Sequence, residues 1–265
     1  NKEGLRLFGN LTYSKNKIVF RDEPAMQYAY QKSEGTRYGE FYGYIAEGYF
    51  QSEEEIKKSP RQMRELAPGD IKYKDLNDDG VIDANDQCYL GKSWFPSWSY
   101  GMGFNINYHN FDLALFFQGV SDVSIMANGG SIDTGNGDWG ASGVGIVPFT
   151  GMGLNPSNVI TKALDRWTAD NPRMTANATT NDNNYVNSTH WLKDGSYLRL
   201  KQASLGYTLE NKKLMDKGIE YLYFYLSGQN LLTFSKFKLW DPELGSNGAK
   251  YPLSRMVTLG MRVSF

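Results

Sequence analysis

The chain has 265 residues, a formal net charge of −1, a mean hydropathy of −0.52 and a single cysteine, Cys88. The small net charge provides no electrostatic basis for binding nucleic acid, and one cysteine excludes an internal disulfide. No apolar run approaches the ~20 residues of a membrane-spanning helix, which excludes a helical membrane protein but leaves open a membrane barrel of alternating strands.

The first predicted element is a strand in which Leu5, Leu7, Leu11 and Tyr13 alternate with polar residues. A period of two residues is typical of a strand with one apolar and one polar face. Residues 21–96 are then expected to form a long connection, and this connection carries the sharpest motif of the sequence.

That motif is DLNDDGVIDANDQ, residues 75–87, which matches the template of a calcium-binding loop. Its oxygen-bearing side chains recur at the template spacing, and Gly80 stands where the template needs a sharp turn. No helical pattern flanks the loop, so we expect a structural calcium site, or a mixed calcium and magnesium site, that cross-links the connection. A metal-free turn rich in Asp and Asn is the alternative. The predicted ligands are Asp75, Asn77, Asp79, the Val81 carbonyl, Asp83 and Asp86.

Two alternating segments follow, at 100–108 and 111–117, and a tight turn at 109–110 predicts that they form a β-hairpin. Residues 122–194 are expected to be a second long connection. A short helix is expected within its stretch SNVITKALDRWTADNP, with Ser157 as the N-cap and Pro172 beyond the end of the helix. Exposed aromatic rings stack on sugars, so tryptophans in or near the connections are candidate ligand contacts, with packing inside ordered connections as the alternative. These tryptophans are Trp139, Trp167, Trp191 and Trp240.

Two more strands are predicted within SYLRLKQASLGYTL and IEYLYFYLSGQNLL, joined by a short turn through residues 212–218. Arg199 and Lys201 interrupt the alternation of the first of these strands, which predicts a β-bulge or a strand end projecting beyond the membrane. The last strand alternates regularly up to Phe265. Outer-membrane barrels commonly end in an aromatic residue, so we expect Phe265 to act as an assembly signal; the alternative is that it only completes an aromatic girdle.

The predicted connections alternate in length. Residues 21–96, 122–194 and 235–253 are long, whereas 109–110 and 210–218 are short. Outer-membrane barrels have long loops on the extracellular side and short turns on the periplasmic side. We therefore predict an all-β fold, an antiparallel transmembrane β-barrel, with the three long connections outside the cell. Because six strands cannot close such a barrel, and open edges in lipid leave backbone groups unpaired, we expect this chain to be part of a larger barrel or to pair with another chain.

Seven stretches, taken together, carry a family resemblance over most of the chain. They are GEFYGYIAEGYFQSEEEI, APGDIKYKDLNDDGVIDANDQ, NFDLALFFQG, RWTADNP, SYLRLKQASLGYTL, SGQNLLTFSKFKLWDPE and YPLSRMVTLGMRVSF. With these stretches in the same order, the chain resembles the C-terminal barrel portion of the SusC/RagA-type TonB-dependent outer-membrane transporters of Bacteroidetes. The resemblance implies a full barrel of about 22 strands, with a plug domain and TonB box that are not part of this chain.

The resemblance also implies a function in the bacterial outer membrane. Such transporters import nutrients, usually glycans (oligosaccharides) or peptides, together with a SusD-like surface lipoprotein that covers the barrel. TonB supplies the energy through the N-terminal region. Motifs of nucleophilic, metalloprotease or phosphate-binding sites are absent from the sequence, so we do not expect an enzyme. The alternative function is that of a secreted, calcium-stabilised β-domain that binds carbohydrate through aromatic residues of its loops.

Overall fold

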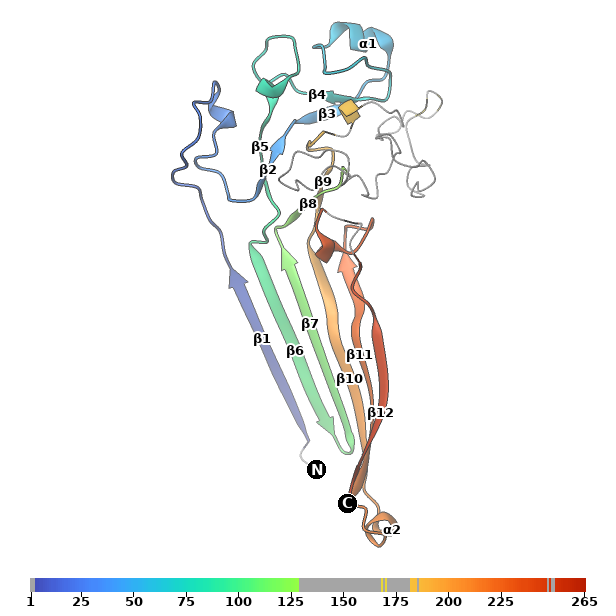
Figure 1. The fold of residues 1–265 in the computed structure, drawn as a ribbon. Helices are drawn as coiled ribbons and strands as arrows, with labels where there is room; N and C mark the ends of the chain where they lie inside the picture. Colours follow the sequence, from blue (N-terminus) through green and yellow to red (C-terminus); the bar gives the residue numbers. More distant parts are fainter. Residues whose placement is uncertain are drawn as a thin grey trace.

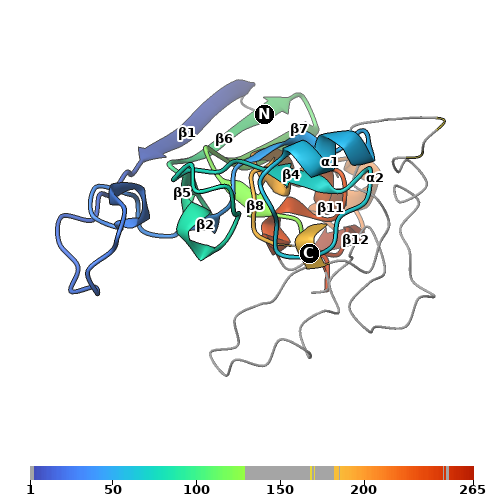
Figure 2. The same ribbon diagram turned by 90° about the horizontal axis from the view of Figure 1, so that it is seen from above.

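The computed structural model describes residues 3–128, 168, 170, 182–184, 186–246, 248 and 251–265. Its main feature is a six-stranded antiparallel sheet with the strand order β1-β6-β7-β10-β11-β12 (Figure 1). The strands are β1 (Gly4–Tyr13), β6 (Trp98–Tyr108), β7 (Phe111–Ser121), β10 (Tyr197–Leu209), β11 (Tyr221–Ser235) and β12 (Met256–Ser264). Viewed from one end of the strands, the sheet forms a curved arc (Figure 2). This curvature and the two open edges are those expected for part of a barrel wall.

The register of the sheet places apolar residues beside apolar residues, and mostly polar residues beside polar ones, across all six strands. One row of paired residues is entirely apolar: Leu5, Ile106, Leu113, Leu205, Leu226 and Leu259. A neighbouring row on the opposite face contains Arg6, Asn105, Ala114, Ser204, Ser227 and Thr258. Because side chains alternate between the faces of a sheet, these rows define one apolar and one largely polar face.

The apolar face of the sheet is exposed rather than packed. Leu5 is 64% exposed and Leu259 is 80% exposed. Among the described residues, only one of the buried hydrophobic side chains, Leu200, belongs to the six-stranded sheet. A soluble β-domain would bury this face in a core, whereas a membrane barrel leaves it to lipid.

The hydrophobic core lies instead in the connections. The first connection contains η1 (Ala29–Gln31), β2 (Glu40–Gly43), β3 (Ala46–Tyr49), α1 (Glu53–Lys58), β4 (Ile71–Tyr73), η2 (Ala84–Asp86) and β5 (Cys88–Ser93). The second contains β8 (Ser124–Met126), η4 (Asp182–Asn184) and β9 (Leu192–Asp194), and the third contains η5 (Pro242–Leu244). The main core combines residues of the first two connections: Tyr44, Tyr49, Ile71, Tyr73, Ile82, Met126 and Trp191.

We call the described residues at 40–93, 124–128, 182–184 and 186–194 the platform. The platform lies at one end of the sheet, and the short connections, one of them containing α2 (Lys212–Met215), lie at the other end (Figure 1). Its small sheets pair β2 with β5, β3 with β4 and β8 with β9. The extracellular position of the long connections stays a prediction.

The six predicted strands and their antiparallel order are confirmed. The irregularity in β10 is a β-bulge, since the register shifts between Leu200 and Gln202 against both neighbouring strands. The helix predicted near residues 157–172 lies outside the described residues, apart from two isolated positions. No helix within the described part of the chain is long and apolar enough to cross a membrane.

Candidate functional site

The predicted metal loop lies in the platform, between β4 and β5. It is attached by a short ladder in which the Arg61 amide donates to the Gly80 carbonyl at 3.0 Å and the Ile82 amide donates to the Arg61 carbonyl at 2.7 Å. Ile82 is 1% exposed and packs in the main core. The loop is therefore fixed at its centre by a backbone ladder and by an apolar anchor.

Carboxylate oxygens shape the loop by accepting backbone amides. The Asp75 carboxylate accepts from Gly80 at 2.8 Å, which holds the tight turn where Gly80 has a φ of +81°. The buried Asp86 carboxylate accepts from Leu76 at 2.7 Å and from Asp83 at 2.8 Å. Asp86, the last predicted ligand, is thus hydrogen-bonded to the residue that follows Asp75, the first predicted ligand, and this bond joins the two ends of the loop.

One buried side-chain oxygen of the loop, Asp75 Oδ1, makes no hydrogen bond. Asp75 Oδ1 is shielded from solvent and has no hydrogen-bond partner, which is costly for a carboxylate oxygen and suits a cation ligand. Within the described residues, however, no three His, Cys, Asp or Glu side chains form a group that could hold a metal ion. Several oxygens are engaged by amides, including Asp79 Oδ1 with Val81 and Asp83 Oδ1 with Asn85. The donor chemistry fits calcium, and the metal site stays a prediction.

A buried polar network joins the two connections next to this loop. Asn184, which is 0% exposed, accepts from the Ile71 amide at 2.9 Å and donates to the Asp70 carboxylate at 2.8 Å. Asn183 accepts from the Gln62 side chain at 2.9 Å, and its carbonyl accepts from the Tyr73 hydroxyl at 2.6 Å. Because Gln62 directly follows Arg61 of the metal-loop ladder, one continuous path links the loop to the second connection.

Sequence reasoning did not identify Asn183 and Asn184 as important. The only signal was the asparagine-rich run NDNNYVN at 181–187, which equally describes a solvated loop. Their partners lie more than a hundred residues earlier, so no local pattern could have paired them.

A histidine and a tyrosine from the two connections also meet in the platform. The Tyr49 hydroxyl lies 3.0 Å from His190 Nδ1. Burial lowers the pKa of His190 from 6.5 to about 4 and raises the pKa of Tyr49 from 10.0 to about 12. Both groups are therefore neutral at physiological pH, and the contact is a neutral hydrogen bond inside the platform.

Two of the four tryptophans that were predicted as candidate ligand contacts pack inside the connections, and the other two lie outside the described residues. Trp191 is 4% exposed, and its indole donates to the Asn184 carbonyl at 2.7 Å, which matches the packing alternative. Trp240 packs against Phe237 in a second small core, and its indole donates to the Gly245 carbonyl. Trp139 and Trp167 lie outside the described residues.

The third connection is held to the sheet by a buried ion pair. Arg199 of β10 is 1% exposed and lies 2.5 Å from the Asp241 carboxylate, with Glu243 at 3.7 Å from its Nε. Arg199 pairs in register with Gln118 and so belongs to the polar face of the sheet. The ion pair therefore ties η5 to the polar face near the platform end.

No family model matches the chain. It is 28% identical over 248 residues to TonB-dependent receptor P3 of Formosa agariphila and 30% identical over 238 residues to its TonB-dependent receptor P26. These alignments cover 88% and 82% of this chain but only 22% of each relative. The chain thus spans about a fifth of the length of these relatives.

Solved structures show the same fold. A structure of the RagAB peptide transporter matches 98% of this chain with a TM-score of 0.67 at 21% identity, over 27% of its own chain. The RagAB peptide importer in its "closed-closed" state matches the whole chain with a TM-score of 0.64. The relatives are receptors and transporters rather than enzymes. The chain is therefore similar in sequence to part of the TonB-dependent receptors of a Bacteroidetes bacterium, and it has the fold of a segment of the β-barrel in the RagAB structures.

Proposed function

We propose that the whole protein is a TonB-dependent importer of oligosaccharide or peptide nutrients. In this proposal the six-stranded sheet of this chain forms part of the barrel wall, and the platform forms part of the entrance to the barrel. The observation that carries the proposal is the exposed apolar row across six antiparallel strands, next to a separately packed platform. The wall separates lipid from a polar interior, and the platform provides an ordered surface where ligand and a SusD-like lipoprotein would meet. Movement of a plug under force from TonB would then open the passage.

Uptake measurements test this function in the full-length protein. Cells that lack the receptor should lose uptake of one labelled class, oligopeptides or oligosaccharides, and regain it when the gene is restored. Deleting TonB, or the SusD-like lipoprotein, should also abolish or strongly reduce that uptake. Uptake that is independent of both the receptor and TonB would overturn the proposal.

We further propose that the loop at 75–87 holds a structural calcium ion. The template spacing, the tight turn at Gly80 and the unpartnered Asp75 Oδ1 support this assignment. The oxygens that now accept amides would rotate toward the ion, as carboxylates with several lone pairs allow. The expected role is to cross-link the loop, because its ladder partner Arg61 and its anchor Ile82 belong to the platform.

A paired substitution tests the calcium site. Full-length protein carrying both Asp75→Ala and Asp79→Ala should lose about one bound calcium per molecule in elemental analysis. Asp78→Asn is the matched control, because it removes a loop charge at a position that is not a template ligand while tolerating the positive φ of +58° there. Equal calcium content in wild type and double variant would refute the site.

A further inference from the structure

Three aromatic rings form an exposed stack between the platform and the barrel wall. We call Tyr38, Phe95 and Trp94 the aromatic stack; Tyr38 precedes β2, and the other two connect β5 to β6 at the platform end of the sheet (Figure 1). The Trp94 and Phe95 rings are 4.0 Å apart at 28°, and the Phe95 and Tyr38 rings are 5.6 Å apart at 26°. Tyr38 is 63% exposed and Trp94 is 54% exposed, so the stack is a surface feature and belongs to neither core.

The backbone beneath the stack is fixed by hydrogen bonds that do not involve the rings. The Trp94 amide donates to the Gly39 carbonyl at 3.1 Å. The Ser93 hydroxyl donates to the Tyr38 carbonyl at 3.2 Å. Gly39 has a φ of +75°, and a Cβ atom there would lie 2.6 Å from both Phe95 and Trp94, so glycine lets these rings lie flat against the backbone. Because the stack is held in place before a ligand arrives, little conformational entropy is lost on binding.

A charged carboxylate lies beside the stack. Asp122 Oδ2 accepts from the Ser97 hydroxyl and from Arg37 at 3.1 Å. Arg37 also donates to the Phe95 carbonyl at 3.5 Å, which places this carboxylate next to the rings. The Ser97 hydroxyl and the Arg37 guanidinium hold the pKa of Asp122 below its usual range, so Asp122 is ionised at neutral pH. The Asp122 side chain is 45% exposed, and no described residue donates to its Oδ1, which can therefore accept from a ligand.

We propose that the aromatic stack and Asp122 bind a sugar ring of an oligosaccharide. The C–H face of the sugar would lie on Trp94, and a hydroxyl at the edge of the ring would donate to Asp122 Oδ1. An apolar peptide side chain or a lipid chain would use the rings but not the ionised carboxylate, whereas a sugar has both an apolar face and hydroxyl donors. The inference rests on the proposed import function and names oligosaccharide, rather than peptide, as the ligand class.

Binding to the purified full-length protein, in a detergent without a sugar headgroup, tests the site. The probes are an array of short neutral oligosaccharides and an array of oligopeptides of similar length. The wild type should bind at least one of the oligosaccharides. Trp94→Ala should weaken this binding about ten-fold, because a stacked ring and its contact area are lost. Asp122→Asn should weaken it about three-fold, since a charge-assisted hydrogen bond becomes a neutral one and asparagine tolerates the φ of +54° at this position.

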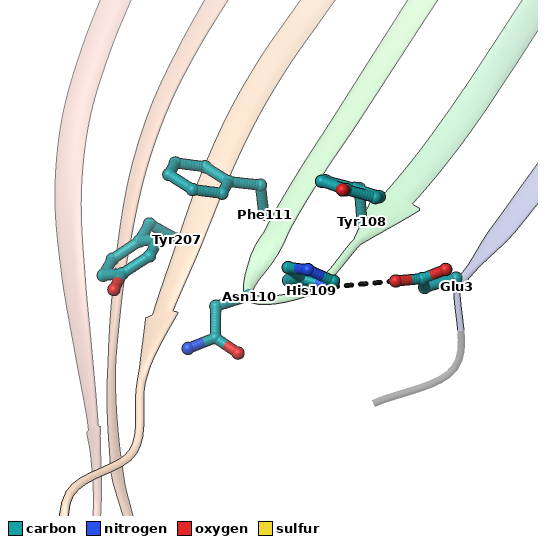
Figure 3. Close-up of a pocket in the computed structure, with 6 residues that line it drawn as sticks. All are labelled: Glu3, Tyr108, His109, Asn110, Phe111 and Tyr207. Atoms are coloured by element: carbon teal, nitrogen blue, oxygen red, sulfur yellow. Dashed lines mark ion pairs between the residues drawn. The ribbon is translucent and has the colours of Figure 1, made fainter.

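Tyr108→Ala is the matched control for the loss of an exposed ring. Tyr108 is 57% exposed and stacks on His109 with the ring centroids 4.3 Å apart, but it lies at the opposite end of the sheet (Figures 1 and 3). This variant should bind oligosaccharides as the wild type does. Circular dichroism of each variant would establish that the barrel is folded before the comparison.

Three results would overturn the site. The first is failure of the wild type to bind any oligosaccharide of the array. The second is oligosaccharide binding that Trp94→Ala leaves unchanged, or that Tyr108→Ala weakens equally. The third is a loss of peptide binding alone in Trp94→Ala, which would assign the stack to the other ligand class. These measurements need no TonB, so a protein that binds sugar through the stack but does not import it would contradict the proposed function and not this site.

Discussion

Replacing Asn184 by alanine should loosen the platform while leaving the barrel wall intact. The substitution removes one hydrogen bond from the Ile71 amide and one to the Asp70 carboxylate, at a position that is 0% exposed. A lost hydrogen bond to a buried polar group costs about 1–3 kcal/mol, so the two lost bonds predict a loss of about 2–6 kcal/mol in the stability of the platform. The six long strands make no use of Asn184 and should be unaffected.

Hydrogen exchange of the full-length protein in detergent measures this directly. Peptides covering residues 44–73 and 186–194 should exchange faster in Asn184→Ala, and peptides from β6 and β7 should not change. Asn187→Ala is the matched control, since this neighbouring asparagine is exposed and the bonds that its side chain makes, one accepted from Asn128 at 2.8 Å and one donated to the Tyr42 carbonyl at 3.5 Å, do not belong to the buried network. If both variants exchange alike, the two connections are not held together by the buried network.

Three other predictions concern lipid contact, pH and assembly. Leu115→Arg places a charge on the apolar face and should cost ~2–4 kcal/mol, whereas Ala114→Arg on the polar face should insert into membranes better; equal failure of membrane insertion would refute the assigned faces. Because burial lowers the pKa of His190 from 6.5 to about 4, protonation favours the unfolded platform, so up to about 3 kcal/mol present above pH 6.5 should be lost as the pH falls toward 4. A platform whose exchange does not rise over this pH range, or rises equally in His190→Gln, would contradict this role. Deleting Phe265, which is 85% exposed, should lower the amount of assembled receptor without changing uptake per assembled molecule, as measured by immunoblots of outer-membrane fractions; unchanged assembly with lost ligand binding would refute both topology and role.

The wall of the barrel could be predicted because its information is local. Alternation of apolar and polar residues identifies a strand and its two faces from one segment at a time. The interruption at Arg199 and Lys201 even located the bulge of β10, since a lost period of two is visible in the sequence itself. The spacing of the loop at 75–87 likewise predicted its tight turn at Gly80, because short-range side-chain-to-backbone bonds determine that conformation.

The platform could not be predicted in the same way. Its short strands have three to six residues, too few for a period to be recognised, and its core joins residues of two connections. Trp191 was a candidate ligand contact by residue type alone, and only packing shows that it is buried.

The sequence by itself determined the long strands, the face that each presents to lipid and the conformation of the acidic loop, because all of these follow from contacts between residues close along the chain. Only the tertiary structure decided that Asn183 and Asn184 close the platform on Gln62 and Ile71, and that Glu3 meets His109 at the far end of the sheet. These pairings join segments about a hundred residues apart. They depend on how the whole chain closes its loops, and that closure leaves no periodic signal in the sequence.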